Sequence, residues 1–166
     1  MIPCPNVYDI FLKTVMDPVD REILEDYIGW FLLRQLENVP QYIVLYGEPA
    51  TGKSVILNTL RNIFGEGCIS YTAEMAKFAH SPIIIIDDAP VDKIIRDTIT
   101  DKELHDKKFF ITTNKLPQQG MSYARVLCMT GKRINKPIFN ELILPGLLEM
   151  TIPYKYYCID KLYRHL

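Results

Sequence analysis

The sequence predicts a single α/β domain in which helices cover a central, mostly parallel sheet of five strands. Two observations support this prediction. Short apolar runs, which are typical of buried strands, alternate along the chain with longer segments of helical periodicity. The chain also has 166 residues, of which 48% are hydrophobic, and this is enough for one domain with its own core. Ordinary Gly, Pro and charged contents exclude disordered and collagen-like classes.

The expected domain has three parts: an N-terminal tail at 1–16, a core at 17–153 and an aromatic, basic C-terminal tail at 154–166. In that tail, Tyr and basic side chains could stack on bases, but their spacing favours packing on the domain.

An N-terminal helix should open the core at Asp17-Pro18, because proline is tolerated in a first helical turn, and end near Asn38. Acidic residues, Glu25 and Asp26 among them, separate its apolar positions and are expected to face solvent. The positions expected to pack on the core are Val19, Ile23, Tyr27, Phe31 and Leu32.

The bounds of the later strands and helices are predicted from the positions of Gly and Pro between apolar segments. Four consecutive isoleucines after Pro82 indicate a central strand that is buried on both faces. Glycines at 65 and 67 should end the helix that precedes them. The expected strands are 43–46, 68–72, 83–86, 109–113 and 125–130, and the expected helices between them are 55–64 and 91–100.

Residues 47–54 read GEPATGKS and fit G-x-x-x-x-G-K-[ST], the phosphate-binding loop of nucleoside-triphosphatases. The motif lies between an apolar run and a helical pattern, which is the context it needs. Lys53 is expected to reach the β- and γ-phosphates of ATP, and the Ser54 hydroxyl to hold Mg²⁺. Backbone N–H groups at the start of the helix would bind phosphate oxygens. The expected nucleotide-binding set is Gly47, Glu48, Pro49, Ala50, Thr51, Gly52, Lys53, Ser54 and Val55.

Two carboxylates, Asp87 and Asp88, follow the four isoleucines. Ligands of open α/β sheets bind at the carboxyl ends of the strands, so these side chains should lie beside the phosphate-binding loop. Asp87 is then expected to help hold Mg²⁺, and Asp88 to act as the general base for the attacking water. The alternative is that the two residues only cap the next turn.

Two further residues are candidates for catalysis. Asn114 ends the strand FFITT, and in additional-strand P-loop ATPases a polar residue there orients the lytic water. This position argues against nucleotide kinases, although Asn114 could instead cap the turn before Pro117. Arg125 begins the last strand and could reach the γ-phosphate of an adjacent subunit as an arginine finger. A surface ion pair is the alternative for Arg125.

In this order the motifs resemble the superfamily 3 helicase domain, and more closely the helicase part of phage, plasmid and large-DNA-virus primase–helicase proteins. The resemblance covers roughly residues 20–152. It rests on four segments: YIGWFLL with QYIVLYGEPATGKSVILNTLRNIFG, IIIIDD, FFITTNKLP, and SYARVLCMTG with NELILPGLLEMTI. It implies a three-layer, AAA+-like core of the additional-strand class, with ATP and Mg²⁺ as ligands.

The resemblance also implies a ring, usually a hexamer, that hydrolyses ATP between subunits and translocates on single-stranded DNA during viral or mobile-element replication. Arg125 is then the trans-acting finger, although the family often has two arginines there. The family's DNA-gripping hairpin lies between the second and third motifs, where this chain is short. The candidates for DNA contact are Lys102, His105, Lys107 and Lys108. A separate primase or initiator protein would supply the missing functions.

Charge and composition place further bounds on function. Residues 1–100 carry eight Lys/Arg against fourteen Asp/Glu, and residues 101–166 carry eleven against six, an asymmetry compatible with one face that meets nucleic acid. Without a signal peptide or a membrane span, an intracellular protein is expected, cytoplasmic or, from a eukaryotic virus, nuclear. The competing functions are a DNA-packaging or assembly ATPase, a nucleotide-binding structural module and a small-molecule kinase.

Overall fold

The structure, a computed structural model, describes residues 1–65, 81–116, 118, 124–131, 134–135, 137 and 139–164. Within these residues four strands form one parallel sheet in the order β2-β3-β1-β4. This is one strand fewer than expected, and the predicted strand 68–72 lies outside the described residues. The strands are β1 (Tyr42–Tyr46), β2 (Ile83–Ile86), β3 (Lys108–Thr113) and β4 (Ala124–Cys128).

The strand order brings the three motifs of the sequence together. β3 lies between β1 and β2, as the additional-strand interpretation predicts, and the register pairs Tyr46 with Thr113 and Ile86 with Ile111. Because all the strands are parallel, the chain leaves β1, β2 and β3 at the same edge of the sheet. The segments that begin at Gly47, Asp87 and Asn114 therefore start from neighbouring points.

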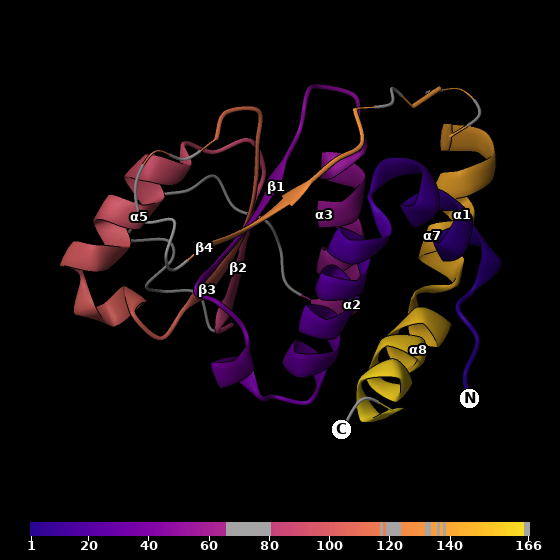
Figure 1. The fold of residues 1–166 in the computed structure, drawn as a ribbon, viewed down its shortest axis with the longest axis horizontal. Coiled ribbons are helices and arrows are strands. Elements are labelled where there is room, and N and C mark those ends of the chain that lie inside the picture. The colour runs from indigo at the N-terminus through magenta and orange to yellow at the C-terminus, as the bar shows by residue number, and fades with distance from the viewer. Residues whose placement is uncertain are drawn as a thin grey trace.

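Helices cover both faces of the sheet, with α5 on one side and the others on the opposite side (Figure 1). None of the helices in the described part of the chain is long and apolar enough to cross a membrane. Short 3₁₀ turns occupy Leu36–Asn38 and Lys102–Leu104, and a π-helical turn occupies Phe139–Ile143. The helices are α1 (Asn6–Val15), α2 (Pro18–Leu32), α3 (Lys53–Phe64), α5 (Val91–Thr100), α7 (Leu144–Glu149) and α8 (Thr151–Arg164).

Alternation along the strands divides the core into two parts. Side chains of one parity, such as Ile85 and Phe110, pack with α1, α2, α3 and α8. Those of the other parity, such as Ile84 and Ile111, pack with Ile94 and Ile95 of α5. Successive strand residues point to opposite faces, so a continuously apolar strand such as IIII serves both layers. The prediction that this strand is fully buried is confirmed.

The N-terminal segment is not a tail. It forms α1, which buries Tyr8, Phe11, Leu12 and Val15 at the i, i+3, i+4, i+7 spacing of an amphipathic helix. Beyond α1 the chain runs along the segment that follows β4, since Thr130 donates its N–H to the Val15 carbonyl at 2.9 Å. The apolar spacing in NVYDIFLKTV was the signal for this helix, and the expectation of a tail was wrong.

Helix α2 starts at Pro18 as predicted, and its predicted core face is confirmed except at one position. Phe31 is buried, Ile23, Tyr27 and Leu32 are half-buried against the core, and Val19 is 67% exposed. Leu24 and Ile28 complete the buried stripe. Glu25, expected in solvent, is only 2% exposed. The reason is that α8 packs along α2 and brings to the carboxylate of Glu25 three partners, two phenols and an ammonium group, from far along the sequence. They are Tyr154, Tyr157 and Lys161, at 3.0, 3.4 and 3.2 Å.

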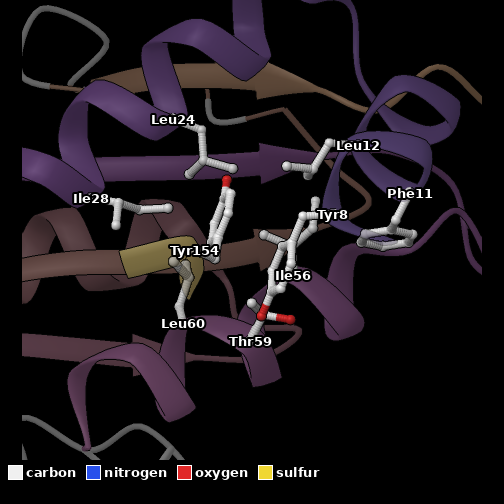
Figure 2. A pocket seen from close by; sticks show the side chains of 9 residues that line it. All are labelled: Tyr8, Phe11, Leu12, Leu24, Ile28, Ile56, Thr59, Leu60 and Tyr154. Carbon is white, nitrogen blue, oxygen red and sulfur yellow. The ribbon is translucent and has the colours of Figure 1, made fainter. Parts of the chain in front are cut away.

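The C-terminal segment likewise belongs to the core rather than to a tail. Tyr154, Cys158 and Leu162 of α8 are buried, which confirms the prediction that its aromatic residues pack on the domain, while Tyr156 and Tyr163 stay exposed. The rings of Tyr8 and Tyr154 stack at 3.9 Å. Figure 2 shows both tyrosines on the wall of a cavity between the helices. At about 10 Å³ this cavity holds at most one water molecule, so it is a packing defect and not a ligand site.

Candidate functional site

The phosphate-binding loop runs from the end of β1 to the first turn of α3. Gly52 has φ of +99°, in the left-handed region, where a residue with a Cβ is strained. A Cβ on Gly52 would also lie 3.0 Å from Ile134 and 3.1 Å from Val15. At Gly47 a Cβ would lie 2.8 Å from the Cβ of Met129. Both glycines of the motif are therefore required by the way the loop packs against other segments.

The loop is held in shape by hydrogen bonds within it and by one from Ile134. Thr51 donates its hydroxyl to the Glu48 carbonyl at 2.7 Å, and Ile134 donates its N–H to the Ala50 carbonyl at 3.0 Å. The Lys53 ammonium donates to the carbonyls of Gly47 and Glu48, the latter at 2.7 Å. Burial lowers the pKa of Lys53 from its ordinary value of 10.5, although nearby carboxylates, those of Asp87 and Asp88 first, oppose this effect. These bonds fix the loop at the first turn of α3 and hold the Lys53 ammonium against it.

The first acidic residue after β2 contacts the phosphate-binding loop directly. Ser54 lies 3.2 Å from Oδ1 and 3.1 Å from Oδ2 of Asp87, and its hydroxyl donates to that carboxylate. Thr112, on β3, donates its hydroxyl to the same Oδ1. Asp87 is thus bonded from α3 and from β3 at once, and the two candidate metal ligands predicted from the sequence are adjacent.

Asp88 and Asn114 complete the polar end of the site. Asp88 has φ of +51° and donates its N–H to the Thr112 hydroxyl at 2.8 Å. The Thr113 hydroxyl contacts the N–H and the carbonyl of Lys115, both at 3.1 Å, and so closes a turn around Asn114. Both Asp88 and Asn114 are exposed.

One open cavity, of about 670 Å³, joins these residues. Nine of the residues predicted from the sequence line it, which shows that the three motifs meet: Pro49, Ala50, Gly52, Lys53, Ser54, Val55, Asp87, Asp88 and Asn114. Gly47, Glu48 and Thr51 do not line it but shape the loop. Four lining residues were missed, namely Thr112, Ile134, Phe139 and Asn140. Only Thr112 had a sequence signal, as a hydroxyl on the strand that ends just before Asn114.

Arg125 does not line this cavity. It is exposed on β4 and pairs in register with Ile43, three residues before the carboxyl end of β1. At about 3.3 Å per residue, this places it roughly 10 Å back from the edge where the phosphate-binding loop begins. Arg125 is therefore not part of this cavity, and its role as an arginine finger stays a prediction.

The residues between Asp88 and β3 form α5 and a 3₁₀ turn, and they do not form a hairpin. Lys102 and His105 are exposed. Lys107 and Lys108 instead donate to the main-chain carbonyls of Ser81 and Val39, at 2.9 and 2.8 Å. The four candidates for DNA contact thus lie at the amino end of β3, away from the cavity, on a short turn and not on a hairpin, and DNA contact by them stays a prediction.

The donor set fits Mg²⁺ bound through a substrate. Ser54 and Asp87 offer hard oxygen ligands within 3.2 Å of one another, of the type that Mg²⁺ prefers. Across the residues that the structure describes, no cluster of three His, Cys, Asp or Glu could hold a metal by itself. Sites of this kind use one or two protein ligands and complete the coordination with phosphate oxygens and water.

Comparisons with known proteins support the fold. No protein-family model and no curated protein matches the chain. Among solved structures, the apo structure of the NrS-1 C-terminal region is similar, with a TM-score of 0.64 and 13% identity over 96% of this chain. Two A-form apo structures of the same region give TM-scores of 0.64 and 0.66 at 12% and 13% identity. The chain spans less than half of those chains, 45–46% of their length, so the likeness concerns one part of a larger architecture.

Proposed function

We propose that this chain is a Mg²⁺-dependent ATPase of the superfamily 3 helicase type, acting as a ring on DNA during viral or mobile-element replication. One observation carries the proposal: the phosphate-binding loop, Asp87, Asp88 and Asn114 line one cavity, with Ser54 hydrogen-bonded to Asp87. A loop that only happened to fit the motif would not bring the two other motifs to the same edge of the sheet. The likeness to the NrS-1 C-terminal region supports the same fold.

In this proposal the phosphate-binding loop binds ATP, and Asp88 and Asn114 take part in its hydrolysis. Backbone N–H groups of the loop and the Lys53 ammonium bind the β- and γ-phosphates. When bound, Mg²⁺ would be held by Ser54 and Asp87 and would neutralise charge on the phosphate oxygens. Asn114 orients a water molecule against the γ-phosphorus, and Asp88 accepts the proton of that water as the new P–O bond forms. The bond to the β–γ bridging oxygen breaks, and ADP leaves with the electron pair.

Asp88 is suited to the role of base because it does not share the hydrogen bonds of Asp87. The side chain of Asp87 accepts from Ser54 and Thr112, whereas the main-chain N–H of Asp88 holds that residue in place and leaves its side chain exposed in the cavity. Both side chains line the cavity, and they differ in that the Asp87 carboxylate accepts from Ser54 and Thr112, whereas Asp88 is held through its main-chain N–H. This division matches a metal-binding role for Asp87 and a proton-accepting role for Asp88.

The first test is ATP hydrolysis over a protein concentration series, with and without single-stranded DNA. Activity that rises steeply with concentration, rises with DNA, and disappears in Lys53→Ala and Arg125→Ala supports a ring translocase. Asp88→Asn should abolish turnover and keep nucleotide binding, because the amide retains the shape of the side chain but cannot accept the proton. Slow turnover that ignores DNA and protein concentration would contradict the helicase part of the proposal.

A DNA-packaging or assembly ATPase is the second candidate, and a specific observation favours it. The segment between β2 and β3 is α5 plus one 3₁₀ turn, and Lys107 at its end and Lys108 at the start of β3 are bonded to main-chain carbonyls. This segment therefore offers fewer groups to grip a DNA strand than the hairpin that the superfamily 3 resemblance implies. A strand-separation assay distinguishes the two: DNA-stimulated hydrolysis without unwinding would favour this second function.

A further inference from the structure

Thr112 is a buried hydroxyl residue of the candidate site that none of the sequence motifs assigns to a role. It lies on β3, two residues before Asn114, and it is 1% exposed. It nevertheless lines the cavity together with Asp87 and Asp88. A buried hydroxyl costs free energy unless its hydrogen bonds are made, so the partners of Thr112 indicate what it does.

The partners of the Thr112 hydroxyl determine the direction of both its hydrogen bonds. The Asp88 main-chain N–H can only donate, and it does so to Oγ1 at 2.8 Å. The single proton of the hydroxyl is therefore available for Oδ1 of Asp87, with which Oγ1 is in contact. The Thr112 carbonyl accepts the N–H of Ala89 at 3.2 Å in addition. One residue of β3 thus bonds three consecutive residues after β2.

These bonds orient the carboxylate of Asp87 and hold the backbone of Asp88. The Asp87 carboxylate is bonded to Thr112 on β3 and to Ser54 on α3, so its position is fixed relative to these two elements. Asp88 is in the left-handed backbone region, with φ of +51°, and the bond from its N–H to Thr112 stabilises that conformation. Without the hydroxyl, a main-chain N–H beside the site would lose its partner and Asp87 would lose one of its two anchors.

We propose that Thr112 is a positioning residue that sets the affinity of the site for the divalent cation that binds with ATP. The inference rests on the proposed ATPase function and deepens it. Thr112 acts through Asp87, whose carboxylate its hydroxyl holds from β3. Hydrogen-bond partners that orient a metal-ligating carboxylate typically change metal affinity or activity by roughly 10- to 100-fold when removed.

The experiment measures binding separately from turnover. A fluorescent ATP analogue is titrated into the protein in EDTA and then at increasing Mg²⁺, and Mn²⁺ binding with nucleotide is followed by electron paramagnetic resonance. The variants are Thr112→Val, which keeps the shape without the hydroxyl, and Thr112→Ser, which keeps the hydroxyl. Thr98→Val is the matched control, since Thr98 is equally buried but bonds to Tyr42 and Ile95 on the other face of the sheet.

For Thr112→Val we expect the Mg²⁺ midpoint to rise by about 10- to 100-fold and the metal-free affinity for the analogue to stay unchanged. Thr112→Ser and Thr98→Val should titrate as the wild type. If Thr112→Val does not fold, Thr112→Ala compared with Thr112→Ser isolates the hydroxyl in the same way.

Two results would count against the inference: a midpoint that Thr112→Val leaves unchanged, or a Thr112→Ser variant as impaired as Thr112→Val, which would mean that only packing matters. A wild type that binds no analogue would refute the proposed function itself. The failure of the inference and that of the proposed function are thus distinguishable.

Discussion

The buried carboxylate of Glu25 offers the sharpest test of how the helices are held together. Glu25 is 2% exposed, and it accepts from Arg21 at 3.4 Å, from Lys161 at 3.2 Å and from Tyr154 at 3.0 Å. The side chains of Arg21 and Lys161 are each 11% exposed, so neither can move fully into water when the carboxylate is removed. The change Glu25→Gln therefore leaves buried positive charge without its main partner.

The magnitude follows from which partners remain. Breaking a buried ion pair by removing one member costs about 3–5 kcal/mol. Arg21 keeps Asp9 at 2.8 Å, but Lys161 keeps a more distant carboxylate, that of Asp26 at 3.8 Å, and the uncharged Glu22 carbonyl at 3.4 Å. Lys161 loses its nearest carboxylate, whereas Arg21 does not, so we expect the free energy of unfolding to fall by about 2–3 kcal/mol, less than the full cost. For a domain of this size the melting temperature should fall by about 4–12 °C.

Urea unfolding at neutral pH, followed by the fluorescence of the single tryptophan, measures this loss. That tryptophan, Trp30, lies on α2 itself and so reports on the helix concerned. Glu22→Gln is the matched control, because Glu22 is exposed on the same helix and should change stability by less than about 0.5 kcal/mol. Adding Lys161→Met to Glu25→Gln should recover part of the loss. If Glu25→Gln and Glu22→Gln unfold alike, the buried charges do not hold α2 to α8.

Three further predictions concern the nucleotide site. Gly52→Ala should weaken binding of an ATP analogue at least tenfold, measured by isothermal calorimetry, because φ of +99° and Cβ contacts at 3.0–3.1 Å strain the loop. The control is Gly65→Ala, since Gly65 has φ of +73° but open space around it. This variant should lose only about 1–2 kcal/mol of stability and bind the analogue unchanged. Burial lowers the pKa of Lys53 below 10.5, so its ammonium loses its positive charge at a lower pH than a free lysine does. The affinity for the ATP analogue should therefore fall at a lower pH in the wild type than in Lys53→Arg, whose guanidinium stays charged. Identical pH profiles of the two proteins would contradict this. Mixing inactive Lys53→Ala with inactive Arg125→Ala should restore part of the ATPase activity, since hybrid interfaces combine an intact loop with an intact arginine; no recovery in assembled mixtures would refute a finger acting between subunits.

The sequence by itself determined the phosphate-binding loop and the strand pattern. Local rules suffice for both. Glycine tolerates the positive φ that the loop needs at position 52, and four consecutive isoleucines fit a strand that is buried on both faces. The strand 83–86 and the helix 91–100 were predicted with the bounds that the structure shows. Asp87 and Asn114 could be placed because parallel strands bring their carboxyl ends to one edge.

Only the tertiary structure decided which residues complete the site and the core. Whether Glu25 faces solvent depends on α8, more than a hundred residues later in the chain, and no local pattern carries that contact. The role of Thr112 likewise depends on the register that sets β3 beside β2, which turns an ordinary strand hydroxyl into the partner of Asp87 and Asp88. Local periodicity specifies elements, whereas long-range packing decides which polar groups are buried together, because burial removes water and obliges each group to find its partner within the protein.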